Sequence, residues 1–214
     1  MAFGLWLQHM LGLNETKMPA SEARHEITAV FAGGLGEPAR SLNAMRTILG
    51  NAFNIHSTIG ATYNLLDVPP FPYEKAKEVG RPLYVKTKRI ISRKDKKIIL
   101  IGHSLGGIFS LYTAHRLIKE GRGDNIHKIF LLGAPLYGID PRVLLTRYKF
   151  ARDILSRPLL TRANRELSLL TDTFLADIPL SRIVTIYSES DVLVDRSQAT
   201  IRGAINEKVD PGHL

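Results

Sequence analysis

The sequence contains no cysteine among its 214 residues. This absence excludes disulfide bonds, thiolate metal sites and cysteine nucleophiles. The sequence also has no apolar run long enough to span a bilayer, because the N-terminal stretch "MAFGLWLQHMLGL" is short and is interrupted by Gln8 and His9. No Lys or Arg precedes this stretch, which is unlike a secretory signal peptide. We therefore expect neither a signal peptide nor a transmembrane helix, and a cytoplasmic location is favoured.

The apolar N-terminal stretch has two interpretations. It contains large apolar side chains such as Phe3, Trp6 and Met10. These residues fit a short helix packed on the body of the protein, which we favour. They also fit an interfacial anchor whose apolar side chains enter lipid, so peripheral membrane contact stays open as the alternative.

Acidic residues are fewer than basic residues, 20 against 29, and the formal net charge is +9. Much of the excess lies in "KTKRIISRKDKK", residues 86–97. Leu83, Ile90 and Ile91 fall at spacings that turn them toward a core while the lysines face water. No aromatic residue interleaves with the later charges, as a nucleic-acid surface would require. We expect a solvated helix face here and no nucleic-acid partner.

Apolar runs that alternate with helical patterns predict an α/β fold. The expected strands lie within residues 25–36, 52–60, 97–101, 128–135, 182–191 and 204–209, and the expected helices within residues 37–50, 82–92 and 105–120. The segment 67–82 contains four prolines and reads as a loop up to the second helix. Continuous apolar strands separated by helices indicate a mostly parallel sheet with helices on both faces.

Residues 141–180 break the alternation, because two helical patterns follow each other there without a strand between them. We predict a single domain, 1–214, in which 141–180 forms a helical cap-like insertion above the carboxyl edge of the sheet. Its leucines fit either an acyl-binding surface or the inward faces of two packed helices. These leucines are Leu144, Leu145, Leu155, Leu159, Leu160, Leu169 and Leu170.

The motif that carries chemistry is "GHSLGG", which follows the apolar run "KIILI" and precedes an amphipathic helix. A sharp turn from strand to helix strains the backbone of its central residue, Ser104. Small residues are required two positions before and after the serine, and Gly102 and Gly106 supply them. The serine hydroxyl is then raised at a helix N-terminus, where partial positive charge favours a developing anion. This pattern predicts a nucleophile.

In this context the motif resembles the nucleophile elbow of the α/β-hydrolase superfamily, in its lipase/esterase-like branch. The resemblance extends from about Glu26 to the end of the chain and is closest to small bacterial lipases. It implies a Ser-His-Asp triad in which the nucleophile, the acid and the histidine follow each other in chain order.

The implied acid follows a late strand and precedes a valine. Asp191 in "IYSESDVLVD" stands at that place, with Val194 three residues later. Asp195 on the same loop and Asp140 after "GAPLYGI" are alternatives for this role. We favour Asp191.

The implied histidine must follow the acid, and His213 in "VDPGHL" is the only histidine downstream of Asp191. Members of the resembled family continue past this histidine into a covering helix, whereas this chain ends at Leu214. This departure keeps open the alternative of a non-catalytic binding or scaffold protein of hydrolase ancestry.

The implied oxyanion hole consists of two backbone N–H groups. One belongs to Leu105, directly after the serine. The other belongs to the "FAGGLG" loop, where Gly34 is the expected donor and Leu35 the alternative. The predicted activity is hydrolysis of carboxylic esters, including lipid esters, without metal or cofactor. A thioesterase or amidase that uses the same triad remains an alternative.

Overall fold

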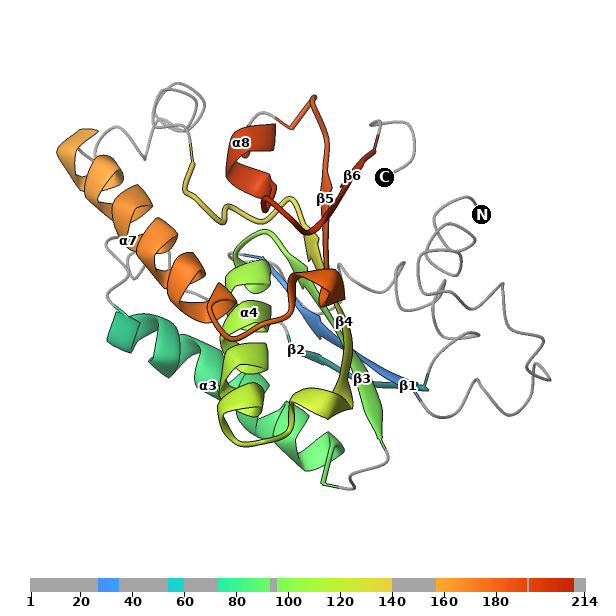
Figure 1. The fold of residues 1–214 in the computed structure, drawn as a ribbon. Coiled ribbons are helices and arrows are strands. Elements are labelled where there is room, and N and C mark those ends of the chain that lie inside the picture. Colours follow the sequence, from blue (N-terminus) through green and yellow to red (C-terminus); the bar gives the residue numbers. More distant parts are fainter. Residues whose placement is uncertain are drawn as a thin grey trace.

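The computed structural model describes residues 27–34, 54–59, 73–92, 96–139, 157–191 and 193–209 (Figure 1). The strands are β1 (Ile27–Ala32), β2 (Asn54–Ile59), β3 (Lys97–His103), β4 (Ile126–Leu132), β5 (Ile183–Tyr187) and β6 (Ile205–Lys208). The helices are α3 (Tyr73–Ile90), α4 (Leu105–Lys119), α7 (Arg157–Leu175) and α8 (Arg196–Ala199), and two 3₁₀ turns are η4 (Gly123–Asn125) and η5 (Leu180–Arg182). The helix expected within 37–50 lies outside the described residues.

The six strands form one sheet in the order β2-β1-β3-β4-β5-β6, and every neighbouring pair is parallel. Each of the six segments in which we expected a strand overlaps one of them, although β3 ends two residues later and β4 begins two residues earlier than expected. Carboxyl ends of parallel strands meet at one edge of a sheet, so the residues that follow β3, β4 and β5 lie close together. The prediction of an α/β fold with a parallel sheet is confirmed.

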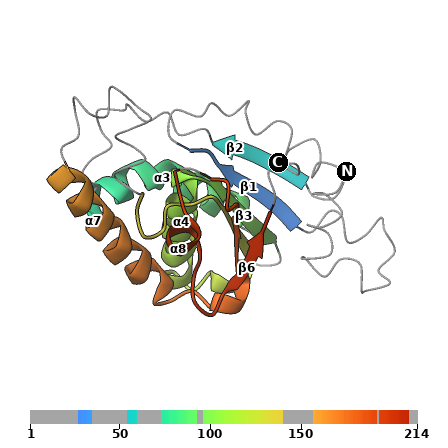
Figure 2. The same cartoon turned by 90° about the horizontal axis from the view of Figure 1, so that it is seen from above.

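Both faces of the central strands of the sheet are buried. Val30, Leu100 and Leu131 point to one face and join the hydrophobic core formed with the helices. Alternate residues of a strand point to opposite faces. Phe31 and Phe130, on the other face, are also buried. Figure 2 shows that α3, α4 and α7 lie on one side of the sheet. The strands β1, β3, β4 and β5 therefore read as apolar runs because neither of their faces meets water, whereas β6 alternates between half-buried and exposed residues.

Helix α4 follows the serine directly and is almost wholly buried along its apolar sides. Its end is a Schellman arrangement: the Gly121 N–H donates to the Ile118 carbonyl and the Arg122 N–H to the Leu117 carbonyl. Gly121 has φ of 71°, a left-handed conformation in which glycine meets no Cβ penalty. The helix therefore lies within the expected segment 105–120.

Helix α3 differs from the prediction, because it begins at Tyr73 rather than near Pro82. The prolines before it led us to extend the loop too far. Pro82 lies inside the helix on its exposed side, where it removes one backbone hydrogen bond. The close approach of α3 to α4 offsets this loss: a Cβ at Gly80 would lie 2.6 Å from the Tyr112 ring, and Leu83 is buried in the core. Tertiary packing therefore overrides the local proline signal.

Helix α7 contributes Leu167, Leu170 and Phe174 to the core. The Phe174 ring lies edge-on to the Tyr112 ring of α4, with 5.7 Å between their centroids. Leu170 is thus an inward-facing residue, whereas Leu169 is 58% exposed. The backbone of residues 141–156, and the side chains of Leu159 and Leu160, lie outside the described part of the chain. The predicted cap within 141–180, and the division into domains, therefore remain predictions.

Candidate active site

The turn that joins β3 to α4, residues 102–107, is here named the serine turn. Its central residue, Ser104, has φ of 51° and ψ of −128°. Among the described residues Ser104 is the only non-glycine residue with positive φ. The backbone is held there by two hydrogen bonds: the Ser104 N–H donates to the Leu132 carbonyl over 2.8 Å, and the Gly107 N–H donates to the Ser104 carbonyl over 2.9 Å. The predicted backbone strain at the serine is confirmed.

The glycines of the serine turn sit where no side chain fits. A Cβ at Gly102 would lie 2.5 Å from the Gly106 carbonyl oxygen. A Cβ at Gly106 would lie 2.2 Å from the Ala32 carbonyl oxygen, at the end of β1. These neighbours are backbone atoms and cannot rotate away. The turn is therefore specified by backbone contacts that only glycine permits.

The expected oxyanion-hole donors come from adjacent elements. Leu105 is the first residue of α4, and the first N–H groups of an α-helix have no partner within the helix. The contact between Gly106 and the backbone of Ala32 and Gly33 brings the end of β1 against the first turn of α4. Gly34 follows directly in the chain, and Leu35 lies outside the described residues.

The turn after β4, residues 133–139, is here named the β4 turn. It begins next to the acid candidate: a Cβ at Gly133 would lie 3.3 Å from Asp191 Oδ2. Gly133 has φ of 52°, and its N–H donates to the Ile186 carbonyl at the end of β5. Asp191 Oδ1 accepts the N–H groups of Leu193 and Val194. The Asp191 carboxyl is thus half-buried and oriented at the ends of β4 and β5.

The alternative acids differ from Asp191. The Asp195 side chain is exposed and caps α8: it accepts the Gln198 N–H, and the Gln198 side chain accepts the Asp195 N–H in return. The Ser197 hydroxyl also donates to the Asp195 carboxylate. Asp195 therefore has a local structural role as a capping box. Asp140 and His213 lie outside the described residues, so the choice of acid and the assembly of a triad remain predictions.

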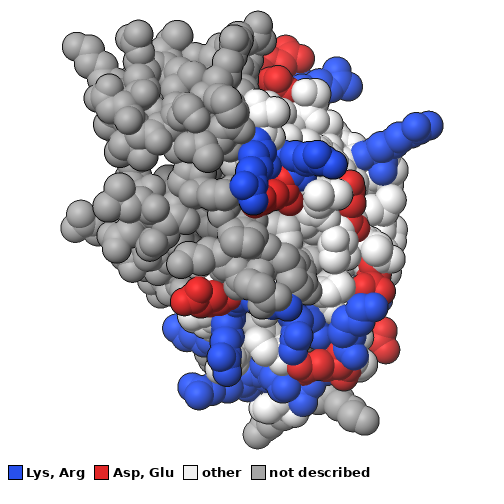
Figure 3. All heavy atoms as spheres, turned by 90° about the vertical axis from the view of Figure 1, so that its left-hand side faces the viewer, with Lys and Arg blue, Asp and Glu red and all other residues white. Residues whose placement is uncertain are grey.

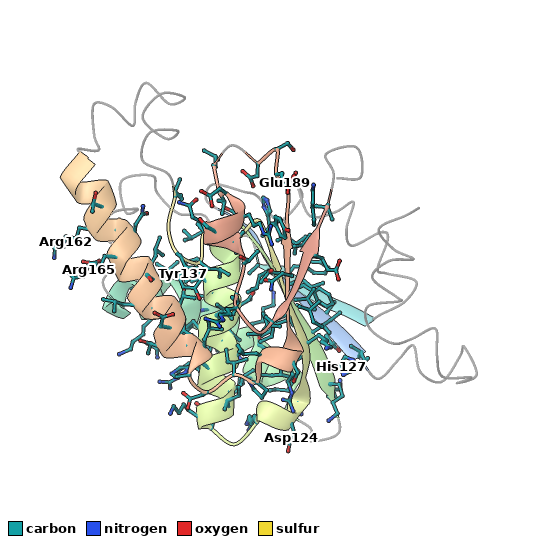
Figure 4. The ribbon with its side chains drawn as sticks, turned by 45° about the horizontal axis from the view of Figure 1, so that its top comes forward. Asp124, His127, Tyr137, Arg162, Arg165 and Glu189 are labelled. Atoms are coloured by element: carbon teal, nitrogen blue, oxygen red, sulfur yellow. The ribbon has the colours of Figure 1, made fainter. Side chains whose placement is uncertain are left out.

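Strand β6, which leads toward His213 in the chain, is fastened to the acid loop. The Val209 N–H donates to the Tyr187 carbonyl just past β6. Lys208 forms an ion pair with Glu189 at 2.6 Å, and this contact holds the pKa of the Glu189 carboxyl below its usual range. Figure 4 shows Glu189, which follows β5, at one end of the molecule, and Asp124, which precedes β4, at the other end.

Sequence reasoning missed the attachments of the β4 turn to α7. Asn164 binds both backbone groups of Ile139, and the Thr171 hydroxyl donates to the Leu136 carbonyl. Figure 4 shows Tyr137 of this turn beside α7. Burial raises the pKa of the Tyr137 phenol, with a further contribution from the Asp172 charge. The only sequence signal for this turn is its content of glycine and proline, which predicts a turn but does not indicate which residues of α7 bind it.

Basic residues gather at the opposite end of the molecule, where Lys and Arg alternate with acidic side chains (Figure 3). Lys88, from the basic stretch, forms an ion pair with Glu120. Lys97 from the same stretch donates to the Asp124 carbonyl. Some cations of this stretch therefore have partners within the fold, which accords with the expected solvated helix face.

The described residues contain no group of three or more His, Asp or Glu side chains that is arranged to hold a metal ion. Within the same part of the chain, no helix has the length and hydropathy required to cross a membrane.

Comparison with known proteins gives two kinds of match. The family model described as "LCAT: Lecithin:cholesterol acyltransferase" matches residues 81–179. Bacillus licheniformis lipase BlEst2 in mature form is similar in structure, with a TM-score of 0.59 and 16% identity over 91% of this chain and 86% of that one. A soluble variant of monoglyceride lipase from Saccharomyces cerevisiae, in complex with a substrate analogue, gives a TM-score of 0.58 at 11% identity over 91% and 80% of the two chains.

The RedJ thioesterase from the prodiginine biosynthetic pathway of Streptomyces coelicolor gives a TM-score of 0.51 at 14% identity, over 96% of this chain and 86% of that one. No curated protein matches this chain. The chain has the α/β-hydrolase fold. Ser104 occupies the strand–helix turn after β3 of this fold, and Asp191 follows β5, two strands further along the sheet. The fold expected from the "GHSLGG" resemblance is confirmed.

Proposed function

We propose that this α/β-hydrolase is a serine hydrolase of carboxylic esters that acts on lipid esters. The observation that carries the proposal is the backbone of Ser104, with φ of 51° at the start of a buried helix. Strain of this kind persists only where the surrounding structure over-determines it, and it is concentrated at active sites. Here the surrounding backbone contacts of Gly102 and Gly106 maintain it.

In the proposed reaction, Ser104 Oγ attacks the ester carbonyl carbon while His213 takes the hydroxyl proton. Asp191 orients the His213 imidazole and stabilises its charged form. The tetrahedral oxyanion is bound by the N–H groups of Leu105 and Gly34. His213 then returns the proton to the leaving alcohol, which leaves an acyl-serine. Water, activated by His213, hydrolyses that intermediate and releases the acid.

The proposed substrate class draws on the names of the similar proteins. The family model is named for acyl transfer from lecithin to cholesterol, and two of the similar structures are lipases. Lipid esters are therefore the first substrates to test, and a thioester is the alternative favoured by the similarity to a thioesterase.

The test is covalent labelling by a fluorophosphonate, followed by turnover of activated esters with short to long acyl chains. We expect stoichiometric labelling of the wild type and none of Ser104→Ala. Both Ser104→Ala and His213→Ala should lower kcat by on the order of 10⁴-fold or more. An unlabelled wild type that is inert to every ester contradicts the proposal and favours the non-catalytic binding protein.

A second candidate function is acyl transfer to an alcohol rather than to water, favoured by the family model that matches residues 81–179. Both reactions share the acyl-serine and differ only in what attacks it. The measurement is the ratio of sterol ester to free fatty acid produced from a phosphatidylcholine with and without added sterol. Free acid as the sole product at saturating sterol decides for hydrolysis.

A further inference from the structure

The β4 turn and the residue before it contact both the serine turn and the acid candidate. Leu132, which directly precedes the turn, accepts the Ser104 N–H. Gly133 lies beside Asp191, because a Cβ at Gly133 would be 3.3 Å from Asp191 Oδ2. Ala134 packs against the serine turn, because a Cβ at Gly107 would lie 2.5 Å from the Ala134 methyl group. A shift of this turn therefore moves the surroundings of both Ser104 and Asp191.

Helix α7 holds this turn by side chains that lie far from it in sequence. Asn164 Oδ1 accepts the Ile139 N–H over 3.0 Å, and Asn164 Nδ2 donates to the Ile139 carbonyl over 2.7 Å. One side-chain amide thus pairs with both groups of one residue, as a neighbouring strand would. The Thr171 hydroxyl donates to the Leu136 carbonyl over 2.6 Å, and both residues are fully buried.

The path of the turn is fitted to Asn164. Gly138 has φ of 110°, and a Cβ there would lie 2.3 Å from Asn164 Cγ. The backbone at Gly138 therefore passes close to the Asn164 amide. The Asn164 side chain occupies the space that a side chain at position 138 would fill.

We propose that Asn164 is a positioning residue of the active site. Through its two hydrogen bonds to Ile139 it fixes the β4 turn, and the fixed turn sets the spacing between Ser104 and Asp191. Thr171 supports the same turn at Leu136. The kinetic consequence rests on the proposed function, whereas the control of the turn by α7 does not.

The first measurement is amide hydrogen exchange, which requires no activity. In Asn164→Ala the amides of Ile139 and Tyr137 should exchange at least about fivefold faster than in the wild type, and that of Ser104 should follow them. Thr171→Val should have a weaker effect of the same kind. The matched control is Thr173→Val, because the Thr173 hydroxyl donates to the Leu169 carbonyl of its own helix and is exposed. This control should leave both turns unchanged.

The second measurement is ester turnover at a temperature where circular dichroism shows every variant folded. Asn164→Ala should lower kcat about tenfold to a hundredfold, as misplacement of reacting groups does, and change KM by less than about threefold. The rate of fluorophosphonate labelling should fall with kcat. Thr173→Val should keep the wild-type kcat.

Unchanged exchange at both turns in Asn164→Ala overturns the inference, whether or not the wild type hydrolyses esters. Faster exchange with an unchanged kcat also overturns it, because the turn then does not set the spacing. If Asn164→Ala does not fold, Thr171→Val takes its place in both measurements. A wild type that resists labelling defeats the proposed function alone, and hydrogen exchange still decides the role of Asn164.

Discussion

Two turns at the carboxyl edge of the sheet are built in opposite ways. The serine turn is determined by its own glycines, which let the backbone of α4 approach the backbone of β1 and β3. The β4 turn is determined by distant groups, since Asn164 and Thr171 of α7 hold its carbonyls and the Gln198 carbonyl accepts the Tyr137 N–H. The serine turn is locally encoded in the sense that the glycines it requires lie within it, although its backbone also contacts Ala32 of β1 and Leu132 of β4. The β4 turn instead requires side chains of α7 and the backbone of α8.

The largest expected effect tests which acid belongs to the active site beside these turns. In Asp191→Asn, the amide oxygen can still accept the Leu193 and Val194 N–H groups. The NH₂ group then replaces the oxygen that lies near Gly133, so a hydrogen-bond donor stands where the wild type has an acceptor. We expect kcat to fall by about 10³- to 10⁴-fold, because the imidazole is no longer held in the productive tautomer. The measurement is kcat on an activated ester.

The matched control is Asp195→Asn, because asparagine is also a good N-cap for α8. It should keep kcat within about threefold of the wild type, as expected of a surface change away from the reacting groups. An equal loss of activity in the two variants would show that the acid has been assigned to the wrong residue.

The next effect tests the locally encoded turn. Gly106→Ala places a methyl group 2.2 Å from the Ala32 carbonyl oxygen, and backbone atoms on both sides must move apart. We expect a loss of about 3 kcal/mol or more in the free energy of unfolding, or failure to fold. Urea titration measures it. Gly123→Ala is the control, since the nearest atom to its Cβ is the side-chain Cγ1 of Ile118, at 3.1 Å, and the substitution should cost far less. Similar costs for both variants would contradict a turn specified by backbone contact.

This contrast explains how much the sequence predicted. The strands, the strain at Ser104 and the extent of α4 were predicted because the sequence signal for each lies in residues close together in the chain. The β4 turn was not, since nothing in "GAPLYGI" names Asn164 or Thr171, which lie 25 and 35 residues from their partners. The start of α3 was misplaced for the same reason, because contact with Tyr112 outweighs the proline signal. The roles of Asp191 and His213 rest on resemblance and chain order, which no local pattern encodes.

A smaller effect is expected at the start of the β4 turn. Gly133→Ala combines a left-handed φ of 52° with a methyl group 3.3 Å from Asp191 Oδ2. We expect a loss of about 1–2 kcal/mol in unfolding free energy from the backbone strain. A displaced carboxylate should also lower kcat about tenfold. Gly121→Ala has similar strain, with φ of 71°, and no atom within 4 Å of its Cβ. Gly121→Ala should lose comparable stability and no activity. An equal fall in kcat in Gly121→Ala would show that the fall in Gly133→Ala does not come from displacement of the Asp191 carboxylate.

The smallest effect sets a baseline away from both turns, where α3 and α4 meet through charged side chains. Glu120 accepts the Tyr84 hydroxyl and pairs with Lys88 at 2.8 Å. The Lys88 hydrogen bond, followed by that of Tyr84, lowers the pKa of the Glu120 carboxyl below its usual range. A carboxyl whose pKa is lower in the folded state stabilises the fold above its unfolded pKa, and this stabilisation is lost as the pH falls through the folded pKa.

Glu120→Gln should therefore lower the unfolding free energy at neutral pH by less than about 1 kcal/mol, the usual worth of an exposed carboxylate's ion pairs. The difference from the wild type should shrink as the pH falls through the lowered pKa of Glu120, because protonation removes the same charge from the wild type. Asp124→Asn is the control, because the Asp124 side chain is 100% exposed and lies 3.8 Å from Arg182. Its urea titrations should follow the wild type at every pH. Because neither substitution lies in the serine turn or the β4 turn, both should leave kcat unchanged. A loss of activity in Glu120→Gln would mean that the far end of α4 is coupled to the serine turn at its start.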